Sequence, residues 1–400
     1  MKILIADSLP EEQVDLLRQK GDECIINPEL KAEEIPDVIS GVDVLVVRST
    51  KVNSEVFERS DRLGLVVRSG AGTNTIDCKA AANYGIYVCN VPGTNSVAVA
   101  ELAMGLLISV DRHISLATSD LKEGKWNKKI YSKSDGLMGK TLGIIGVGEI
   151  GLAVAERARS FGMNVLAKRA PRKSGIETRI RTAGIKLLNS LDELVEQSDV
   201  VSIHLPGSPE TTGFINSEFF DLMKPGAILI NTSRGEIIDE DALLIAMNEK
   251  GIRAGLDVFC DEPAEGTGEF ISKIAKHPNV IGTHHIGAST KQAQDATVLK
   301  TIEVIDAYRK GNVINCVNMA EDRIGNSTII IRHYDKVGVL AEVFEILRKE
   351  NLNVETMQNK VFDGSKAALA IIDVSGSPTS QLLIQLSQIN HVIHVHESTP

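Results

Sequence analysis

Residues 141–151 read Thr-Leu-Gly-Ile-Ile-Gly-Val-Gly-Glu-Ile-Gly and place Gly146, Gly148 and Gly151 in the spacing G-x-G-x-x-G. The apolar run before Gly146 predicts a buried strand, and the alternation of small, apolar and charged residues after Gly151 predicts a helix. In this setting the first glycine permits a tight turn, the second lets a ligand approach the backbone, and the third lets helix and strand pack closely. The segment therefore predicts a strand, a ligand-cradling turn and a helix.

A turn of this kind offers unpaired backbone N–H groups and the positive end of a helix dipole to phosphate groups. Glycines between a strand and a helix can also be purely structural, and the motif alone is a weak signal. Here the strand, the helix and the later strand–helix units all agree. We therefore predict that this turn binds the pyrophosphate of a dinucleotide.

Short apolar strands alternate with amphipathic helices on both sides of the glycine turn, which predicts βαβ units and parallel sheets. A long apolar-periodic segment between the two series predicts one helix over 96–124, capped by Ser96, with Glu101 in its early turns. A second long helix is predicted over 289–310. The other predicted elements are strands 2–7, 43–49, 65–69 and 86–90, helix 11–20, and strands 141–146, 164–169, 200–205, 227–231, 255–259 and 280–284.

After residue 320 the pattern changes to strand, helix, strand, strand, helix, strand. This βαββαβ order predicts a small ferredoxin-like domain. Its predicted elements are 328–333, 337–349, 356–362, 367–374, 379–388 and 392–397.

The composition excludes several classes of protein. The net charge of −10 disfavours nucleic acid as a partner, and no run is long and apolar enough to span a bilayer. Asp7 interrupts the N-terminal apolar run too early for a signal peptide. The five cysteines are scattered without paired spacing, which argues against a metal site or a disulfide framework. We expect a cytoplasmic protein with reduced thiols and no bound metal.

The end of strand 164–169 bears on the choice of dinucleotide. An acid at this position would bind the ribose hydroxyls of NAD, but the chain carries Lys168 and Arg169, followed by Arg172 and Lys173. Arg169 could pair with the 2′-phosphate of NADP in bidentate fashion. The basic segment could equally be a solvated loop on an enzyme that uses NAD(H). Both cofactors stay open.

Three polar residues follow three successive strands of the second series: Arg234, Glu262 and His285. Ligands bind at the carboxyl ends of the strands in an open parallel sheet. Taken singly, the three could be a surface charge, a helix-start acid and a loop histidine. Together, at neighbouring strand ends, they predict a catalytic group.

Over residues 1–320 the chain resembles the D-isomer-specific 2-hydroxyacid dehydrogenases, through the glycine turn, the entry to the helix at 95–101, and the Arg, Glu and His segments in that order. Within the family it looks most similar to the phosphoglycerate dehydrogenases. That similarity rests on Val-Arg-Ser at 47–49, Gly-Lys-Trp at 124–126 and His-Ile-Gly-Ala-Ser-Thr at 285–290. The resemblance implies a Rossmann domain over 96–292, inserted into a flavodoxin-like substrate-binding domain over 1–95 and 293–320.

The resemblance also implies the reaction: 3-phosphoglycerate is oxidised to 3-phosphohydroxypyruvate in the first step of L-serine synthesis. His285 would be the general acid/base, Glu262 its orienting partner, and Arg234 the clamp on the substrate carboxylate. Imidazole titrates near neutral pH, and a neighbouring carboxylate favours its charged form. A guanidinium holds a carboxylate in fixed geometry.

Further residues match binding positions of the family. The expected cofactor contacts are Gly146, Gly148, Glu149, Ile150, Gly151, Leu205, Thr232, Ser233, Gly287 and Ala288, with Asp257 at the nicotinamide amide. The expected substrate contacts are Arg48, Arg68, Ser69, Gly70, Ala71, Asn95, Lys128 and Lys129.

One departure from the family concerns the catalytic histidine, because His284 stands where proline is usual. The following Ile-Gly-Ala fits the family pattern only if His285 is the catalytic residue. Two other functions remain as alternatives: an NADPH-dependent hydroxypyruvate or glyoxylate reductase, which the Lys168–Arg169 pair would suit, and a non-catalytic corepressor. The retained Arg234, Glu262 and His285 argue against the corepressor.

Residues 325–400 resemble an ACT domain, a module that binds amino acids and pairs between subunits. The resemblance implies L-serine as an allosteric inhibitor and a homodimer or homotetramer. His333, Asp335 and Asn353 match the ligand-binding positions. Asp335 replaces the usual Asn, and a carboxylate cannot donate to the serine carboxylate as an amide can. We therefore expect weak serine inhibition; the alternative is a purely structural dimerisation module.

Overall fold

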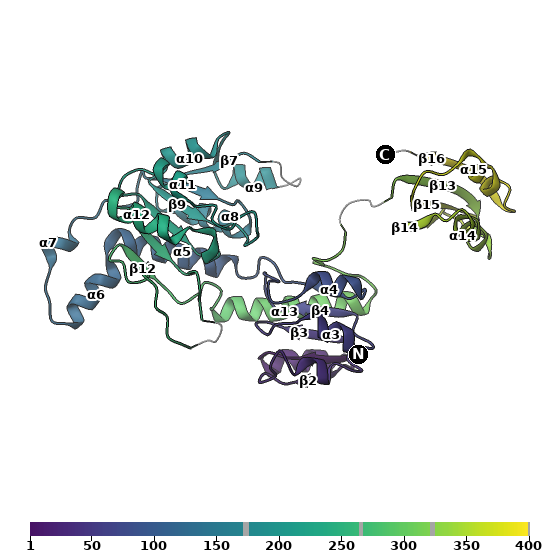
Figure 1. The fold of residues 1–400 in the computed structure, drawn as a ribbon, viewed down its shortest axis with the longest axis horizontal. Helices are drawn as coiled ribbons and strands as arrows, with labels where there is room; N and C mark the ends of the chain where they lie inside the picture. The colour runs from purple at the N-terminus through teal and green to yellow at the C-terminus, as the bar shows by residue number, and fades with distance from the viewer. Residues whose placement is uncertain (171–175, 264–266, 321–324, 399–400) are drawn as a thin grey trace. The chain divides into compact units, whose positions relative to one another are not determined.

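The computed structural model describes residues 1–170, 176–263, 267–320 and 325–398. The basic residues Arg172 and Lys173 lie outside the described residues. The chain divides into two compact units, residues 1–318 and 319–400. The first unit holds two parallel sheets, and the second holds one antiparallel sheet (Figure 1).

The first sheet is parallel and has the strand order β2-β1-β3-β4-β5, which is the flavodoxin-like order. Helices α2, α3 and α4 bury one face, and α1 and α13 bury the other. The strands are β1 Lys2–Ile5, β2 Glu23–Ile26, β3 Val44–Val47, β4 Leu65–Arg68 and β5 Tyr87–Cys89. The helices are α1 Glu11–Arg18, α2 Ile35–Val38, α3 Ser54–Arg59, α4 Cys78–Asn83 and α13 Lys291–Arg309.

The second sheet is parallel, with the order β12-β11-β10-β9-β6-β7-β8. It is the expected Rossmann sheet, and its order reverses between β6 and β9. Its apolar strands are covered on one face by α5, α8 and α9 and on the other by α10, α11 and α12. The strands are β6 Thr141–Ile145, β7 Asn164–Lys168, β8 Lys186–Leu188, β9 Val200–Ile203, β10 Ile228–Asn231, β11 Arg253–Leu256 and β12 Val280–Gly282. The helices are α5 Ser96–Arg112, α8 Glu149–Ser160, α9 Ile176–Thr182, α10 Leu191–Gln197, α11 Ser217–Leu222 and α12 Glu240–Lys250.

The chain order makes the second sheet an insertion into the first layer. All strands of the first sheet precede it, whereas α13 follows it and packs back on β4 and α1 (Figure 1). The fold expected from the sequence, a Rossmann sheet inserted into a flavodoxin-like layer, is therefore confirmed.

The antiparallel third sheet has the order β14-β15-β13-β16, and α14 and α15 bury one face of it. The βαββαβ arrangement is confirmed, and it fits the expected ACT-like domain. Its elements are β13 Ser327–Tyr334, α14 Val339–Lys349, β14 Asn353–Val361, β15 Ala367–Ser375, α15 Ser380–Ser387 and β16 Val392–Ser398.

The helix expected over 96–124 is wrong in one respect, because it is two helices. Helix α5 ends at Arg112, His113 adopts a left-handed conformation with φ of 56°, and α6 begins at Ile114 and ends at Lys122. A short helix α7, Lys128–Tyr131, follows. Ser96 does not cap α5: it is the first helical residue, and its buried hydroxyl has no hydrogen-bond partner among the described residues. Strands β2 and β8 were not expected.

The described part of the chain lacks two features. None of its helices is long and apolar enough to cross a membrane. It contains no group of three or more His, Cys, Asp or Glu placed to hold a metal ion, and the five cysteines are free thiols.

Candidate active site

The structure favours glycine at each of the three positions in the turn after β6 for a different reason. Gly146 has φ of +98°, and a Cβ on it would lie 2.5 Å from the carbonyl oxygen of His204. A Cβ on Gly151 would lie 2.3 Å from the carbonyl oxygen of Gly146, so this glycine permits the close packing of α8 on β6. Gly148 precedes α8, and a Cβ on it would meet no heavy atom of the described residues within 4 Å. The turn therefore keeps its middle glycine accessible to a ligand.

Buried polar atoms without partners lie at the ends of the neighbouring strands. The hydroxyl of Thr232, after β10, and Nδ1 of His204, after β9, are buried and accept or donate no hydrogen bond among the described residues. Both follow strands adjacent to each other in the second sheet. Unsatisfied buried polar atoms are rare in native proteins. Together with the open space at Gly148, they fit a dinucleotide bound across the carboxyl ends of β6, β9 and β10.

The remaining expected cofactor residues surround the same sheet edge. Glu149, the first residue of α8, forms a bidentate ion pair with Arg179. The distances are 2.5 Å from Nη1 of Arg179 to Oε1 of Glu149 and 2.8 Å from Nη2 to Oε2. That hydrogen bond lowers the pKa of Glu149. The Arg169 side chain is exposed at the end of β7, and its backbone N–H bonds to Leu188. Ile150 and Leu205 are half-buried against the two cores of the second sheet.

His285 and Glu262 form the central pair of the site. Nδ1 of His285 lies 2.7 Å from Oε2 of Glu262, and Oε1 of Glu262 accepts the backbone N–H of Phe259 at 2.9 Å. The hydrogen bond to Glu262 raises the pKa of His285. Burial opposes ionisation of Glu262, but the bonds from His285 and Phe259 outweigh it and lower the pKa of Glu262. The pair therefore favours an imidazolium beside a carboxylate.

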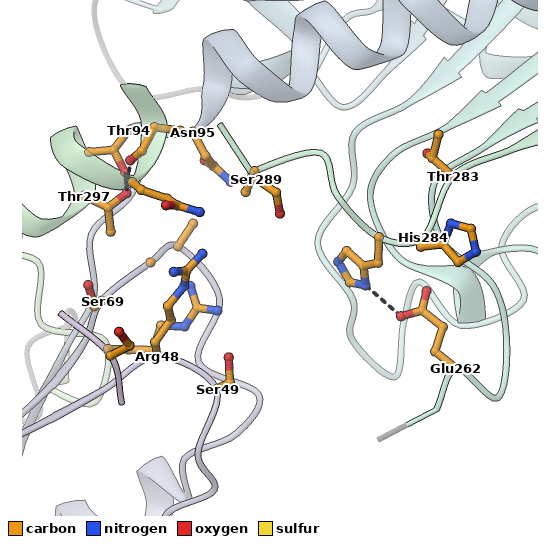
Figure 2. Close-up of a pocket in the computed structure, with 18 of the residues that line it drawn as sticks. Arg48, Ser49, Ser69, Thr94, Asn95, Glu262, Thr283, His284, Ser289 and Thr297 are labelled. Carbon is orange, nitrogen blue, oxygen red and sulfur yellow. Dashed lines mark hydrogen bonds and ion pairs between the residues drawn. The ribbon is translucent and has the colours of Figure 1, made fainter. Parts of the chain in front are cut away.

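His284 takes no part in this pair. In Figure 2 its ring lies apart from the dashed bond between His285 and Glu262, on the side away from Arg48. The structure thus joins Glu262 to His285, the histidine that the sequence pattern favours.

Asp257 holds the turn that carries His285. Its Oδ1 accepts the Thr283 hydroxyl at 2.5 Å and the Ile286 N–H at 2.9 Å, and its Oδ2 accepts the Gly287 N–H at 2.8 Å. Asp257 is 1% exposed, and its backbone carbonyl accepts the N–H of His285. A Cβ on Gly287 would lie 3.0 Å from Oδ2. These bonds keep His285, with φ of 52°, in a left-handed conformation that a non-glycine residue rarely adopts.

Asn231 holds the loop that carries Arg234. Its side chain accepts the backbone N–H and the hydroxyl of Ser233 and donates to the carbonyl of Arg234 at 2.8 Å. Asn231 is fully buried at the end of β10. The guanidinium of Arg234 reaches the loop after β4, since a Cβ on Gly72 would lie 2.8 Å from its Nη2. Arg234 therefore connects the two sheets of the first unit at the site.

Two further arginines lie at the first sheet. Arg68 ends β4, and its side chain folds over Gly70, where a Cβ would lie only 1.5 Å from Nη1. Burial, and then the charges of Arg234 and Arg48, lower the pKa of Arg68. Its Nε is buried without a partner, and within the described ranges neither Arg48 nor Arg68 forms an ion pair. The cluster therefore has the positive charge and the unsatisfied hydrogen-bond donor that a bound anion would need.

One cavity of about 1130 Å³ brings most of these residues together. Figure 2 shows Arg48 and Ser69 on one wall and Glu262 on the opposite wall. The hydroxyl of Ser69 accepts a bond from Thr301. The expected residues that line the cavity are Arg48, Arg68, Ser69, Gly70, Ala71, Asn95, Glu262, His285 and Ala288.

Some expected residues lie elsewhere. Lys128 and Lys129 are exposed on α7 and do not line the cavity. In the second unit His333 is buried, with Nδ1 at 2.8 Å from the Tyr334 carbonyl and Nε2 at 3.2 Å from Asn359. Asp335 and Asn353 are exposed, and Asn353 donates to Glu355.

Sequence reasoning missed the residues that position the site. Asn231 was not expected to have a role, although an amide at the end of an apolar strand is a signal for loop anchoring. Asp7, which binds the loop of Arg48, stands out in the sequence only as an interruption of an apolar run. Its contacts join segments 41 residues apart, and no local pattern predicts them.

Comparison with known proteins gives the family. Residues 104–287 match the model of the "D-isomer specific 2-hydroxyacid dehydrogenase, NAD binding domain". A D-3-phosphoglycerate dehydrogenase of Haemophilus influenzae is 32% identical over 402 residues, covering 98% of this chain and 96% of its own. The chain belongs to the D-isomer-specific 2-hydroxyacid dehydrogenase family. The resemblance drawn from its motifs is confirmed.

Other members of the family differ in how much of each chain is matched. A hydroxypyruvate reductase of Thermotoga maritima is 42% identical, over 76% of this chain and 97% of its own. A D-3-phosphoglycerate dehydrogenase of Methanocaldococcus jannaschii is 39% identical over 81% of this chain. The chain spans only 61% of that relative's length.

Solved structures of the family agree with the fold of the first unit. A D-lactate dehydrogenase of Aquifex aeolicus, complexed with NAD and lactic acid, has a TM-score of 0.68 at 28% identity and covers 80% of this chain and 100% of its own. An acyclic imino acid reductase in complex with NADPH and D-Arg has a TM-score of 0.70 at 29% identity and covers 79% and 100%. Solved structures similar to this chain therefore include one complex with NAD and one with NADPH.

Proposed function

We propose that this enzyme is a D-3-phosphoglycerate dehydrogenase, which oxidises 3-phosphoglycerate to 3-phosphohydroxypyruvate and so opens L-serine synthesis. The observation that carries the proposal is the pair Arg48 and Arg68 on the cavity that also holds His285, with Arg234 close enough for its charge to act on Arg68. A substrate with a carboxylate at one end and a phosphate at the other supplies anions for three arginines. A smaller hydroxy acid has a single carboxylate and leaves part of the cluster unpaired.

The positions of the arginines support a division of the two anionic groups of the substrate between them. Arg234 stands beside Gly72 and influences the titration of His285, so it suits the carboxylate next to the reacting carbon. Arg48 follows β3 and Arg68 ends β4, so both line the cavity from the first sheet and suit the phosphate. A guanidinium pairs with carboxylate or phosphate oxygens through two parallel hydrogen bonds.

The chemistry of the protein is proton transfer and orientation. The bound dinucleotide supplies the hydride acceptor. Since Nδ1 of His285 donates to Glu262, Nε2 is left to take the proton of the C2 hydroxyl. The Glu262 carboxylate then stabilises the imidazolium that forms, and in the reverse direction the imidazolium returns the proton to the oxo oxygen.

The cofactor is a nicotinamide dinucleotide held by Gly146, Gly148 and Gly151, with Thr232, Ser233, Gly287 and Ala288 at its nicotinamide half. Lys168 and Arg169 at the end of β7 support use of NADP(H) as well as NAD(H). Among the described residues, Oδ2 of Asp257 accepts one hydrogen bond, from the Gly287 N–H, and so has room to accept another from the nicotinamide amide.

The second candidate is a hydroxypyruvate reductase, because the Thermotoga maritima relative has the higher identity. Its match accounts for 76% of this chain, whereas the Haemophilus influenzae phosphoglycerate dehydrogenase matches 98%. A relative named as a D-3-phosphoglycerate dehydrogenase therefore matches this chain over nearly its whole length, across both units. This length match and the arginine cluster favour the phosphorylated substrate.

Assembly and regulation complete the proposal. Helix α6 has no buried residue, and Ile114, Leu121 and Trp126 are exposed by 49%, 58% and 82%. This apolar surface suits a homodimer or homotetramer. The second unit serves as an ACT regulatory domain with L-serine as its inhibitor, near Asp335 and Asn353. Because both nitrogens of His333 are already bonded, serine must rearrange that side chain to engage it.

The experiment that tests the proposal follows the absorbance of NADH and NADPH with phosphohydroxypyruvate, hydroxypyruvate and glyoxylate. The proposal predicts the largest kcat/KM with phosphohydroxypyruvate. A larger kcat/KM with hydroxypyruvate or glyoxylate would establish the reductase instead, and no turnover with any of the three would refute both.

A further inference from the structure

The loop that carries Arg48 begins at the topological switch point of the first sheet. In the order β2-β1-β3-β4-β5, the strands β1 and β3 are neighbours. The strand that follows β1, which is β2, lies on one side of this pair, and the strand that follows β3, which is β4, lies on the other side. Ligands bind at such a point, beyond the carboxyl ends of the two strands. Asp7 follows β1 and Arg48 follows β3, so both stand at this position.

One carboxylate oxygen of Asp7 holds three consecutive residues of that loop. Oδ2 accepts the backbone N–H of Arg48 at 2.7 Å and those of Ser49 and Thr50 at 3.2 Å each. The hydroxyl of Thr50 donates to the carbonyl of Ala6 at 3.3 Å. Charged acceptors of backbone N–H groups make the stronger class of hydrogen bond. The loop is therefore fixed on the end of β1.

Asp7 does not neutralise the arginines beside it. Among the described residues it forms no ion pair with Arg48 or Arg68, although its charge acts on Arg68. Its carboxylate is directed to the backbone, and the two guanidinium groups stay available to an anion in the cavity. An acid in this position thus orders the loop while it leaves the cationic side chains unpaired.

We propose that Asp7 is a positioning residue that determines specificity: it holds Arg48 where a substrate phosphate binds, and so makes the enzyme prefer phosphorylated over unphosphorylated 2-oxo acids. The inference rests on the proposed function. Ser8, Leu9 and Pro10, which follow Asp7, line the same cavity as Arg48 and Ser49. The chain after β1 and the chain after β3 therefore form one wall, and Asp7 joins them.

The chain contains a matched control at the other end of the same strands. Asp43 precedes β3, and its Oδ2 accepts the backbone N–H of Lys2, at the start of β1, at 2.8 Å. It also pairs with Arg62. Asp43 therefore makes the same kind of link between β1 and β3 at the edge of the sheet away from the cavity.

The test compares wild type with Asp7→Ala, Asp7→Asn and Asp43→Ala. The measured quantity is the ratio of kcat/KM for phosphohydroxypyruvate to kcat/KM for hydroxypyruvate, together with KM for the dinucleotide. Asp7→Ala should lower the ratio about tenfold to a hundredfold, chiefly through KM, as expected when one charge-assisted hydrogen bond to the phosphate is lost. Asp7→Asn keeps a neutral acceptor and should give an intermediate ratio. Asp43→Ala should leave the ratio at the wild-type value even if it lowers Tm.

The outcomes separate this inference from the proposed function. A wild-type ratio well above one that is unchanged in Asp7→Ala overturns the inference and leaves the proposed function standing. An equal fall of the ratio in Asp43→Ala reduces Asp7 to a structural link. A wild-type ratio below one overturns the proposed function and the inference with it. If Asp7→Ala does not fold, a ratio of the two kcat/KM values that stays at the wild-type level in Asp7→Asn overturns the inference instead.

Discussion

The substitution Gly70→Ala displaces Arg68 without changing the chemistry of that side chain. A Cβ at this position would lie 1.5 Å from Nη1 and 2.5 Å from Cζ of Arg68, and both distances are impossible. The colliding atoms belong to the end of a flexible side chain, so the guanidinium must move while the backbone of β4 stays. Gly70 also has φ of +152°, a conformation that strains any other residue.

The expected magnitudes follow from these two effects. Loss of one charge-assisted hydrogen bond to the substrate costs about 1.5–3 kcal/mol, which corresponds to a rise in KM of roughly tenfold to 150-fold. The strained backbone should cost about 1–3 kcal/mol of the free energy of unfolding. We expect kcat to change far less than KM, because Arg68 ends β4 of the first sheet, whereas Glu262 and His285 follow strands of the second sheet.

The assay is steady-state reduction of phosphohydroxypyruvate, with thermal unfolding measured in parallel. Gly85→Ala is the control, because Gly85 has φ of +67° in the same layer but a Cβ there meets nothing within 4 Å. Both variants should lose stability, and only Gly70→Ala should raise KM. An unchanged KM in Gly70→Ala, or an equal rise in Gly85→Ala, would refute the assignment of Arg68 to the substrate anion.

Four further predictions concern the catalytic pair, the cofactor and the tail. His285→Ala should lower kcat by about two to four orders of magnitude with little change in dinucleotide binding; a larger loss in His284→Ala would mean that the wrong histidine is assigned. The bond to Glu262 raises the pKa of His285, and oxidation needs the neutral imidazole, so the oxidation rate should rise with pH through a pKa above the usual imidazole range. Glu262→Gln should move that rise to lower pH, and an unmoved pH profile would contradict the pairing. Arg169→Asp should weaken use of NADPH and improve use of NADH through repulsion of the 2′-phosphate; unchanged cofactor ratios would leave Arg169 a solvated charge. Millimolar L-serine should inhibit the full chain weakly and should not inhibit a chain that ends near residue 320; no response of the full chain would leave the second unit an assembly module or a sensor of another amino acid.

The sequence predicted the fold because the strongest patterns are long and local. Buried parallel strands such as β6 and β9 are continuous apolar runs, and the glycine spacing determines the turn and the helix start after β6. Strands β2 and β8 lie at the edges of their sheets and keep exposed residues, so they lack the continuous apolar run that marks the buried strands. The break at His113 was missed because apolar periodicity continues through it, and a single left-handed residue leaves no pattern in the sequence.

The site was predictable where chemistry marks a strand end and not where tertiary contacts decide. Arg234, Glu262 and His285 stand out as ionisable residues at the ends of apolar runs. Asp7 and Asn231 act through hydrogen bonds to loops, and Asp7 reaches a loop that lies far away in the sequence. Lys128 was expected at the substrate because it is a cation near a family motif, but α7 places it away from the cavity of its own chain.

The most direct test of the central claim, that arginines of the first sheet recognise a substrate phosphate, is a comparison of kcat/KM for phosphohydroxypyruvate and hydroxypyruvate in wild type and in Arg48→Gln. The account predicts that wild type prefers the phosphorylated substrate. It predicts that Arg48→Gln loses most of this preference, by about tenfold or more, while its activity on hydroxypyruvate changes little. A wild-type enzyme that prefers hydroxypyruvate, or an Arg48→Gln variant that keeps the full preference, would contradict it.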